Sequence, residues 1–168
     1  MSTNEEVFFK WSADYSVGIA TIDKQHQELV NILNRLFIAV SQREGDKVIA
    51  GILDALMAYT QTHFALEEKL MMQAKYRDFP AHQAEHRQLI AQLDRLSKKY
   101  LLEEQPIYFE MLSFLKHWLK EHIQGVDTLY SEDLRRAGFS TEAWEQDADA
   151  AFARMSESRK WWEIWKAA

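Results

Sequence analysis

Cysteine is absent from this 168-residue chain. Disulfides and thiolate metal ligands are therefore excluded. Glycine and proline are scarce, with 5 and 2 residues. The apolar residues instead recur at intervals of three and four through long windows, which is the period of an α-helix. The sequence predicts an all-α fold.

No apolar run approaches the roughly 20 residues that a membrane span needs, so we expect no membrane insertion. The chain also lacks a cationic start followed by an apolar run, so we expect no signal peptide and a cytoplasmic location. The net charge is -6 and Lys and Arg do not cluster, which gives no electrostatic reason to expect nucleic acid.

Apolar residues make up 47% of the chain, enough for one sizeable core. Residues 1–20 form an aromatic-rich arm that we expect to lie over this core without regular structure. Residues 21–131 follow as a bundle, and residues 132–168 as a C-terminal helical extension. The helices are predicted from about 21, with Thr21 as N-cap, to the break at 41–46, from 46 to 73, from 80 to 101, and from Pro106 towards Gly125. Short joints between them indicate an antiparallel up-down four-helix bundle.

The extension contains one more predicted helix of about 25 residues, after Gly138 as a stop signal and Ser140 as a cap. Its apolar stripe comprises Trp144, Ala148, Phe152, Met155, Trp162 and Trp165. Trp161, Trp162 and Trp165 could cover the bundle, form a contact between two copies or dock a protein partner, and packing on its own bundle is the plain expectation. The helix is acidic overall, which disfavours anionic membranes.

Histidine gives the strongest signal. Five of the six histidines fall on the inward stripes of four successive helices: His26, His63, His82, His86 and His122. Residues four apart in a helix are about 40° apart around the axis and about 6 Å apart along it, so His63 with Glu67, and His82 with His86, can each grip one centre. One such histidine alone is more often an ordinary core or surface residue. Five together, buried without partners, would cost several kcal/mol each, and a metal supplies the compensation.

The number of ligands predicts two ions. A tetrahedral zinc site takes about four protein groups, whereas five imidazoles, Glu67 and Asp127 make seven. Two ions that share bridging carboxylates account for all of them. Imidazole and carboxylate ligands with an open position suit iron, although ligand type alone leaves zinc and manganese open.

The spacing between His122 and Asp127 is irregular. Five residues on a regular helix rotate two side chains about 140° apart. Gly125 lies between them, and we expect the helix to end, widen or bulge there, a distortion often found at functional sites.

Four segments carry a resemblance to the bacteriohemerythrins, the bacterial members of the hemerythrin family: "IDKQHQEL", "HFALEEKLM", "HQAEH" and "WLKEHIQGVD". The resemblance covers about residues 7–131 and agrees in ligand types, in their order and in the spacing of five. It implies two iron ions bridged by an oxo or hydroxo group. It further implies the following ligands: His82, His86 and His122 on one iron, His26 and His63 on the other, and Glu67 and Asp127 as bridges.

The second iron is then one ligand short, and the resemblance implies that this open position takes up O2. The family lines the position with apolar side chains, and the matching residues are Leu29, Phe64, Trp118, Leu119 and Ile123. A dry pocket would keep water and reductants away. Ordinary core packing is the alternative role for all five.

Four polar residues near these motifs have weaker signals. His117 sits on another side of its helix from the ligand face, and we expect it at the surface. Asp23, Glu68 and Glu85 border the ligands and could orient imidazoles, but a solvated helix face is the expected role of each.

We expect the first of three possible functions, and the other two are alternatives. The first is reversible O2 binding without enzymatic turnover, for storage, delivery or sensing. The second is a diiron enzyme that acts on peroxide or nitric oxide or oxidises a substrate. No obvious proton donor appears among the pocket residues, and no Glu-x-x-His pair of the ferritin-like oxidases occurs. The third is a signalling module in which the metal state moves the C-terminal helix.

Overall fold

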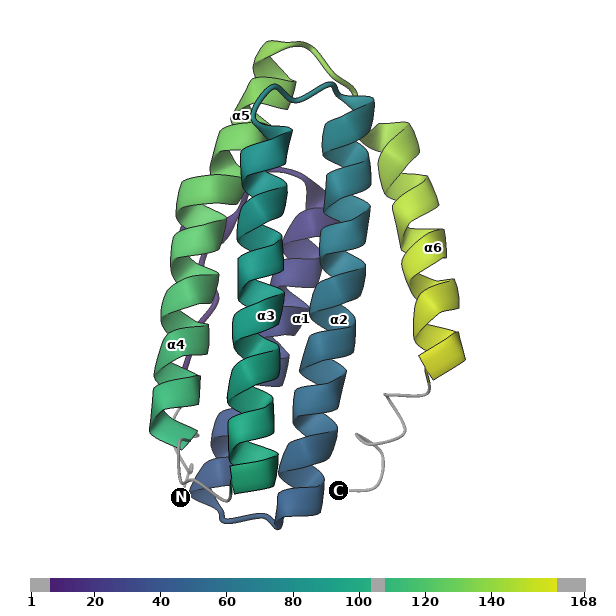
Figure 1. Ribbon diagram of the computed structural model, residues 1–168. Helices are drawn as coiled ribbons and strands as arrows, with labels where there is room; N and C mark the ends of the chain where they lie inside the picture. Colours follow the sequence, from purple (N-terminus) through teal and green to yellow (C-terminus); the bar gives the residue numbers. More distant parts are fainter. Residues whose placement is uncertain (1–6, 104–107, 160–168) are drawn as a thin grey trace, which may run out of the picture.

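The computed structural model describes residues 7–103 and 108–159, and within them the regular structure is entirely helical. Four long helices form the bundle: α1 (Ala20–Ser41), α2 (Asp46–Gln73), α3 (Phe79–Glu103) and α4 (Tyr108–Glu121). They run alternately down and up (Figure 1). The predicted all-α fold and antiparallel bundle are confirmed. The expected start of the fourth helix at Pro106 lies outside the described residues.

The core lies along the bundle axis, where the inward stripes of the helices meet. Its largest fully buried side chains include Ile22, Ile32, Leu33, Leu36, Leu53, Leu70, Met71, Leu93, Leu96, Met111 and Leu112. Burial of each such side chain stabilises the folded protein by about 1.5–3 kcal/mol relative to its exposure to water. This apolar packing fixes the positions of the polar side chains that share the interior.

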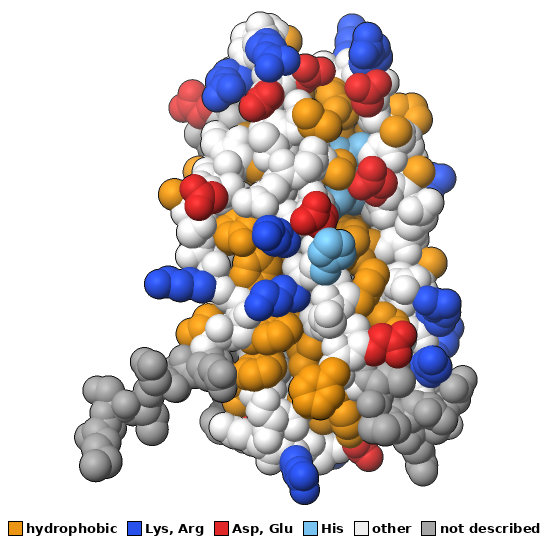
Figure 2. Space-filling view, turned by 90° about the vertical axis from the view of Figure 1, so that its left-hand side faces the viewer, with side chains coloured by type: hydrophobic (Ala, Val, Ile, Leu, Met, Phe, Trp, Pro, Cys, Tyr) orange, Lys and Arg blue, Asp and Glu red, His pale blue; other side chains and the backbone are white. Residues whose placement is uncertain are grey.

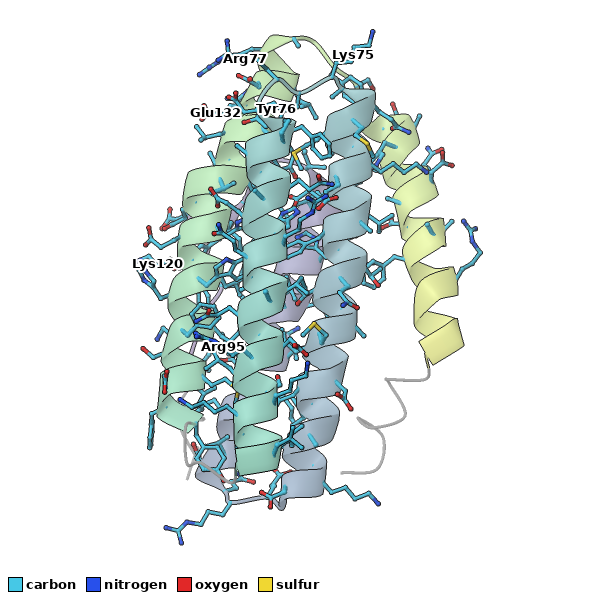
Figure 3. All side chains as sticks on the ribbon, in the orientation of Figure 1. Lys75, Tyr76, Arg77, Arg95, Lys120 and Glu132 are labelled. Atoms are coloured by element: carbon cyan, nitrogen blue, oxygen red, sulfur yellow. The ribbon has the colours of Figure 1, made fainter. Side chains whose placement is uncertain are left out.

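The turn between α2 and α3 brings their facing ends together. Lys75 has a φ of 55°, and the Tyr76 N–H donates to the Met71 carbonyl at 2.9 Å, which is the pattern of a left-handed helix stop. Lys75 and Tyr76 are labelled at this turn in Figure 3. The last turns of α2 therefore lie beside the first turns of α3.

The N-terminal arm packs on the bundle as expected, and it is tied down by polar contacts. The Phe9 N–H donates to Asn34 Oδ1 at 2.8 Å, and Asn34 Nδ2 donates back to the Phe9 carbonyl at 2.8 Å. Lys116 Nζ donates to the Phe8 carbonyl at 2.6 Å. Residues 1–6 of the arm lie outside the described residues. Within residues 7–20 the expectation of no regular structure was wrong in two places, because Ala13–Tyr15 form a short 3-10 helix, η1, and α1 already begins at Ala20.

The start of α1 differs from the prediction. Thr21 is not the N-cap, because α1 begins at Ala20 and Ile19 precedes it without a side-chain cap. The hydroxyl of Thr21 instead donates to Asp149 Oδ1 at 3.3 Å. A residue far away in the sequence therefore takes part in the contacts of this helix start.

α4 does not stop at Gly125. It passes into η2 (His122–Asp127), one turn of π-helix, and continues as α5 (Thr128–Arg136). Both the backbone N–H and the hydroxyl of Thr128 bond to the Ile123 carbonyl, five residues back. This is the hydrogen-bond spacing of a π-helix, and the predicted widening is confirmed.

The predicted C-terminal helix is α6 (Glu142–Arg159). It begins after Thr141 rather than at the predicted cap Ser140, because the Thr141 carbonyl accepts the Glu145 N–H at 2.8 Å. The described helix has 18 residues, fewer than the expected 25 or so. Trp161, Trp162 and Trp165 lie outside the described residues. No helix in the described part of the chain is long and apolar enough to span a membrane.

Candidate metal centre

The seven predicted ligands lie together in the half of the bundle near the α2–α3 turn, where Figure 3 shows nitrogen and oxygen atoms gathered between the helices. All seven are buried. Their donor atoms form two groups, each with all atoms within 4.8 Å of one another. One group contains Glu67, His82, His86, His122 and Asp127, and the other contains His26, His63, Glu67 and Asp127. The two carboxylates are shared between the groups.

Asp127 lies between the two groups. Its Oδ2 is 3.1 Å from His26 Nε2, and its Oδ1 is 3.1 Å from His82 Nε2 and 3.0 Å from His122 Nε2. One oxygen therefore faces each group, which is the orientation of a bridging carboxylate.

Three imidazole nitrogens converge at one point. His86 Nε2 lies 3.1 Å from His82 Nε2 and 3.2 Å from His122 Nε2. Each contact between two nitrogens would need its own shared proton to be a hydrogen bond, and His86 Nε2 makes two such contacts. Two nitrogens about 2.1 Å from one ion and at right angles would be roughly 3.0 Å apart, so this spacing fits ligands of a common cation.

Several buried atoms of the cluster have no hydrogen-bond partner within the described residues. They are His26 Nδ1 and Nε2, Glu67 Oε2, His82 Nδ1, His122 Nδ1 and both Asp127 oxygens. Buried polar groups are normally paired, since an unpaired one costs about 1–3 kcal/mol and a charged one costs more. Cations would relieve the unpaired donor atoms that face the cluster, so the residues present fit a metal centre.

Glu67 is the second shared carboxylate. Its Oε2 lies 3.3 Å from His86 Nε2 and 3.8 Å from both His63 Nε2 and His82 Nε2. Its Oε1 accepts the Tyr130 hydroxyl at 2.6 Å. Sequence reasoning missed Tyr130, whose position three residues after Asp127 on the continued helix was the only available signal.

Outer contacts fix the orientation of two imidazoles. His63 Nδ1 lies 2.7 Å from Gln25 Oε1, an oxygen that can only accept, so Nδ1 carries the proton and Nε2 keeps its lone pair. His86 Nδ1 lies 3.0 Å from Glu68 Oε1. Sequence reasoning missed Gln25, although it directly precedes the predicted ligand His26.

The expectation of a solvated face for the three bordering carboxylates was wrong for Glu68, because its contact with His86 draws it against the core. Glu85 is half-exposed, and its Oε2 lies 3.7 Å from His122 Nδ1. Within the described residues, the polar contacts of Asp23 are with the N-terminal arm and not with a predicted ligand. Asp23 accepts the Ser16 hydroxyl at 2.5 Å and the Val17 N–H at 2.8 Å, and so holds the N-terminal arm.

Burial and charge move the pKa values of the cluster in opposite directions. Burial lowers the pKa of His63 to about 3, so this imidazole is neutral at pH 7. Burial also disfavours a charge on His122, but the Asp127 carboxylate outweighs it and raises the pKa of His122 to about 10. Although burial favours the neutral acid at Asp127, the facing imidazoles, His122 first, hold its pKa well below the usual value.

Of the five predicted pocket residues, Leu29, Phe64, Leu119 and Ile123 are buried and Trp118 is half-buried. The Phe64 ring stacks on His86 with centroids 3.7 Å apart, and Trp118 stacks on His122 at 4.7 Å. The two aromatic residues therefore cover imidazoles of the three-histidine group.

The sixth histidine stands apart from the cluster. His117 is exposed on α4, as expected from its side of the helix. Figure 2, which views the α4 side of the molecule, shows histidine at the surface there among charged and apolar side chains.

Comparison with known proteins agrees with this geometry. The family model described as "Hemerythrin HHE cation binding domain" matches residues 17–133. The bacteriohemerythrin of Stenotrophomonas maltophilia is 31% identical over 125 residues, which cover 74% of this chain and 80% of that protein. The bacteriohemerythrin of Methylococcus capsulatus is 33% identical over 119 residues, 71% of this chain and 90% of that protein. A crystal structure of wild-type hemerythrin superposes with a TM-score of 0.68 at 32% identity, over 74% of this chain and 95% of that one. The chain belongs to the hemerythrin family.

Proposed function

We propose that this chain binds O2 reversibly at a diiron centre. The observation that carries the proposal is the division of seven buried donors into two adjoining groups that share Glu67 and Asp127. Membership of the hemerythrin family supports the same ligand. The proposed ligands of one iron are His82, His86 and His122, those of the other are His26 and His63, and the two carboxylates bridge them.

The two groups differ in their number of imidazoles. Three histidines serve one position and two serve the other, so the second position has one protein ligand fewer. When iron is bound, the pair supplies the electrons that reversible O2 binding requires. We place the O2 position on the His26 and His63 side for this reason.

The side chains around the proposed centre orient its ligands and exclude water from the proposed O2 pocket. Gln25 holds the proton of His63 on Nδ1, and Tyr130 holds one oxygen of Glu67. Leu29, Leu119 and Ile123 are buried, and as proposed pocket residues they exclude water. The proposed pocket has no carboxyl, imidazole or aliphatic hydroxyl group that could deliver a proton, which favours binding and release over turnover.

The test is a cycle of oxygenation. Protein loaded with iron and reduced without air should contain two iron ions per chain, gain a visible absorption band when O2 is admitted, and lose it when O2 is removed. The cycle should repeat with little loss of amplitude, and metal-free protein should show no band. Rapid oxidation with no coloured intermediate, or turnover of added peroxide or nitric oxide, would replace this proposal by an enzymatic one.

A further inference from the structure

Helix α6 lies outside the residues 17–133 that match the family model. It runs beside α2 on the right of Figure 1 and packs on both α1 and α2. Trp144 and Ala148 are buried, and the Phe152 ring lies 4.7 Å from the Tyr59 ring. The expected packing of this helix on its own bundle is thus confirmed for the described residues.

The first turn of α1 receives its acceptor from α6. Ile19, the residue before α1, provides no side-chain cap. The Thr21 N–H donates instead to Glu145 Oε2 at 3.1 Å, and the Thr21 hydroxyl donates to Asp149 Oδ1 at 3.3 Å. The first N–H groups of a helix have no partner within it, and negative charge is favourable beside them. Glu145 therefore does the work of a cap from another helix.

The position of Glu145 is itself fixed. The hydroxyl of Thr141 donates to Glu145 Oε1 at 2.7 Å, so each oxygen of the carboxylate has a separate donor. The side chain is thus held in a single orientation at the point where α6 meets α1.

The capped turn is directly connected to the metal centre. Thr21 precedes Gln25 and His26 by about one helical turn on α1. Gln25 fixes the proton of His63, and His26 faces Asp127. A shift of the α1 start would therefore move both a proposed ligand and the partner of another.

Helix α6 also covers this flank. A pocket of about 370 Å³ remains between α6 and the bundle, lined by Lys24, Gln25, Glu28, Tyr59, Asp149, Phe152 and Ala153. Gln25 lies at its inner side and is only 4% exposed. Three residues of α6 form the outer part of the lining, so without them Gln25 would face a wider opening.

We propose that α6 is a clamp and cover on the His63 flank of the centre, with Glu145 as the residue that positions α1. The clamp holds the turn that carries Gln25 and His26, and the cover limits the access of water to the Gln25–His63 hydrogen bond. Its effect on O2 binding rests on the function proposed above. Its effect on α1 does not.

Hydrogen exchange on the full-length, metal-free protein tests the clamp. Glu145→Ala should speed exchange in the first turn of α1 about fivefold, the usual effect of losing a helix cap. Glu145→Gln keeps an acceptor oxygen for Thr21 and should recover most of the protection. Asp147→Ala removes the same charge from an exposed position of α6 and should leave exchange unchanged. Unchanged exchange in Glu145→Ala, or an equal effect of Asp147→Ala, would overturn the clamp.

Autoxidation of the iron-loaded protein tests the cover. Glu145→Ala and Phe152→Ala should lose the oxygenated absorption band severalfold faster than the wild type and the Asp147→Ala control. If exchange changes but autoxidation does not, the link between α6 and the centre is refuted. If the wild type itself does not bind O2, the proposed function fails, and the exchange result still decides whether the clamp exists.

Discussion

Asp127 Oδ1 lies 3.0 Å from His122 Nε2, although five positions separate the two residues. On a regular helix their side chains would be about 140° apart. The π-helical turn His122–Asp127 adds one residue to the turn, so the fifth residue returns to the face of the first. The irregular backbone is thus what allows one continuous helical segment to bring both the His122 imidazole and the Asp127 carboxylate to the same buried cluster.

Gly125 is not needed for this turn. It lies in the π-helical turn without a positive φ, and a Cβ built on it meets nothing within 4 Å. Gly125→Ala should therefore leave iron content unchanged and raise the free energy of unfolding by up to about 1 kcal/mol, because alanine favours helices. Elemental analysis measures the iron content, and urea unfolding measures the free energy of unfolding. Loss of iron, or lower stability, would mean that the turn depends on the flexibility of glycine.

The convergence of the proposed ligands was predictable because their spacing follows helical periodicity. His63 with Glu67, and His82 with His86, are fixed by four-residue spacing, and the irregular His122–Asp127 spacing itself predicted the distortion. The outer contacts were not predictable, because they join distant residues. Gln25 and His63 are separated by 38 positions, and Glu67 and Tyr130 by 63. The prediction of Thr21 as N-cap was wrong for a similar reason, since Thr21 lies inside α1 and its N–H donates to Glu145, 124 positions away.

The metal-free protein should lose stability in alkali through His122. Its folded pKa of about 10 exceeds the ordinary value of 6.5 because of the Asp127 carboxylate. A raised pKa adds stability that is full below pH 6.5 and disappears as the pH rises through 10. Urea unfolding of metal-free protein should therefore show a decline of a few kcal/mol across this window.

The matched variant for this test is His122→Asn, in which the alkaline decline should be smaller. His117→Ala, at an exposed position, should keep the full decline. Iron loading should also flatten the curve, because a cation then replaces the proton on His122. Equal slopes in the wild type and His122→Asn would show that the proton resides elsewhere.

Tyr130 should affect metal affinity although it is not itself a proposed ligand, because it holds one oxygen of Glu67. It is fully buried and donates to Glu67 at 2.6 Å. Tyr130→Phe keeps the ring and removes this hydrogen bond. The loss should weaken iron binding roughly tenfold, because removing a hydrogen bond to a metal ligand commonly lowers metal affinity by that much. The free energy of unfolding should fall by about 1.5–3 kcal/mol, the usual contribution of a hydrogen bond to a charged group.

A chelator competition and urea unfolding measure the two effects of Tyr130→Phe. Tyr76→Phe is the control, since its ring packs 6.2 Å from that of Tyr130 but is partly exposed. A similar loss of affinity in both variants would point to general loosening of the helix ends rather than to the bond with Glu67.

Substitutions of His63 and His117 give the most direct test of the proposed metal centre. His63 is 1% exposed, is neutral at pH 7 because of its lowered pKa, and points its free nitrogen at the shared carboxylate Glu67. His63→Ala removes one of only two imidazoles from the proposed O2 side and should abolish the oxygenated band. His117→Ala changes an exposed imidazole on α4 and should leave iron content and the band nearly intact.

The two variants also separate ligand loss from misfolding. His63→Ala vacates the space of a buried imidazole, so free imidazole in the buffer should restore part of the band if the residue acts as a ligand. Circular dichroism should show the same helix content in both variants, because the apolar core is untouched. Oxygenation that survives His63→Ala, or iron that is lost from His117→Ala, would contradict the proposed assignment of the ligands.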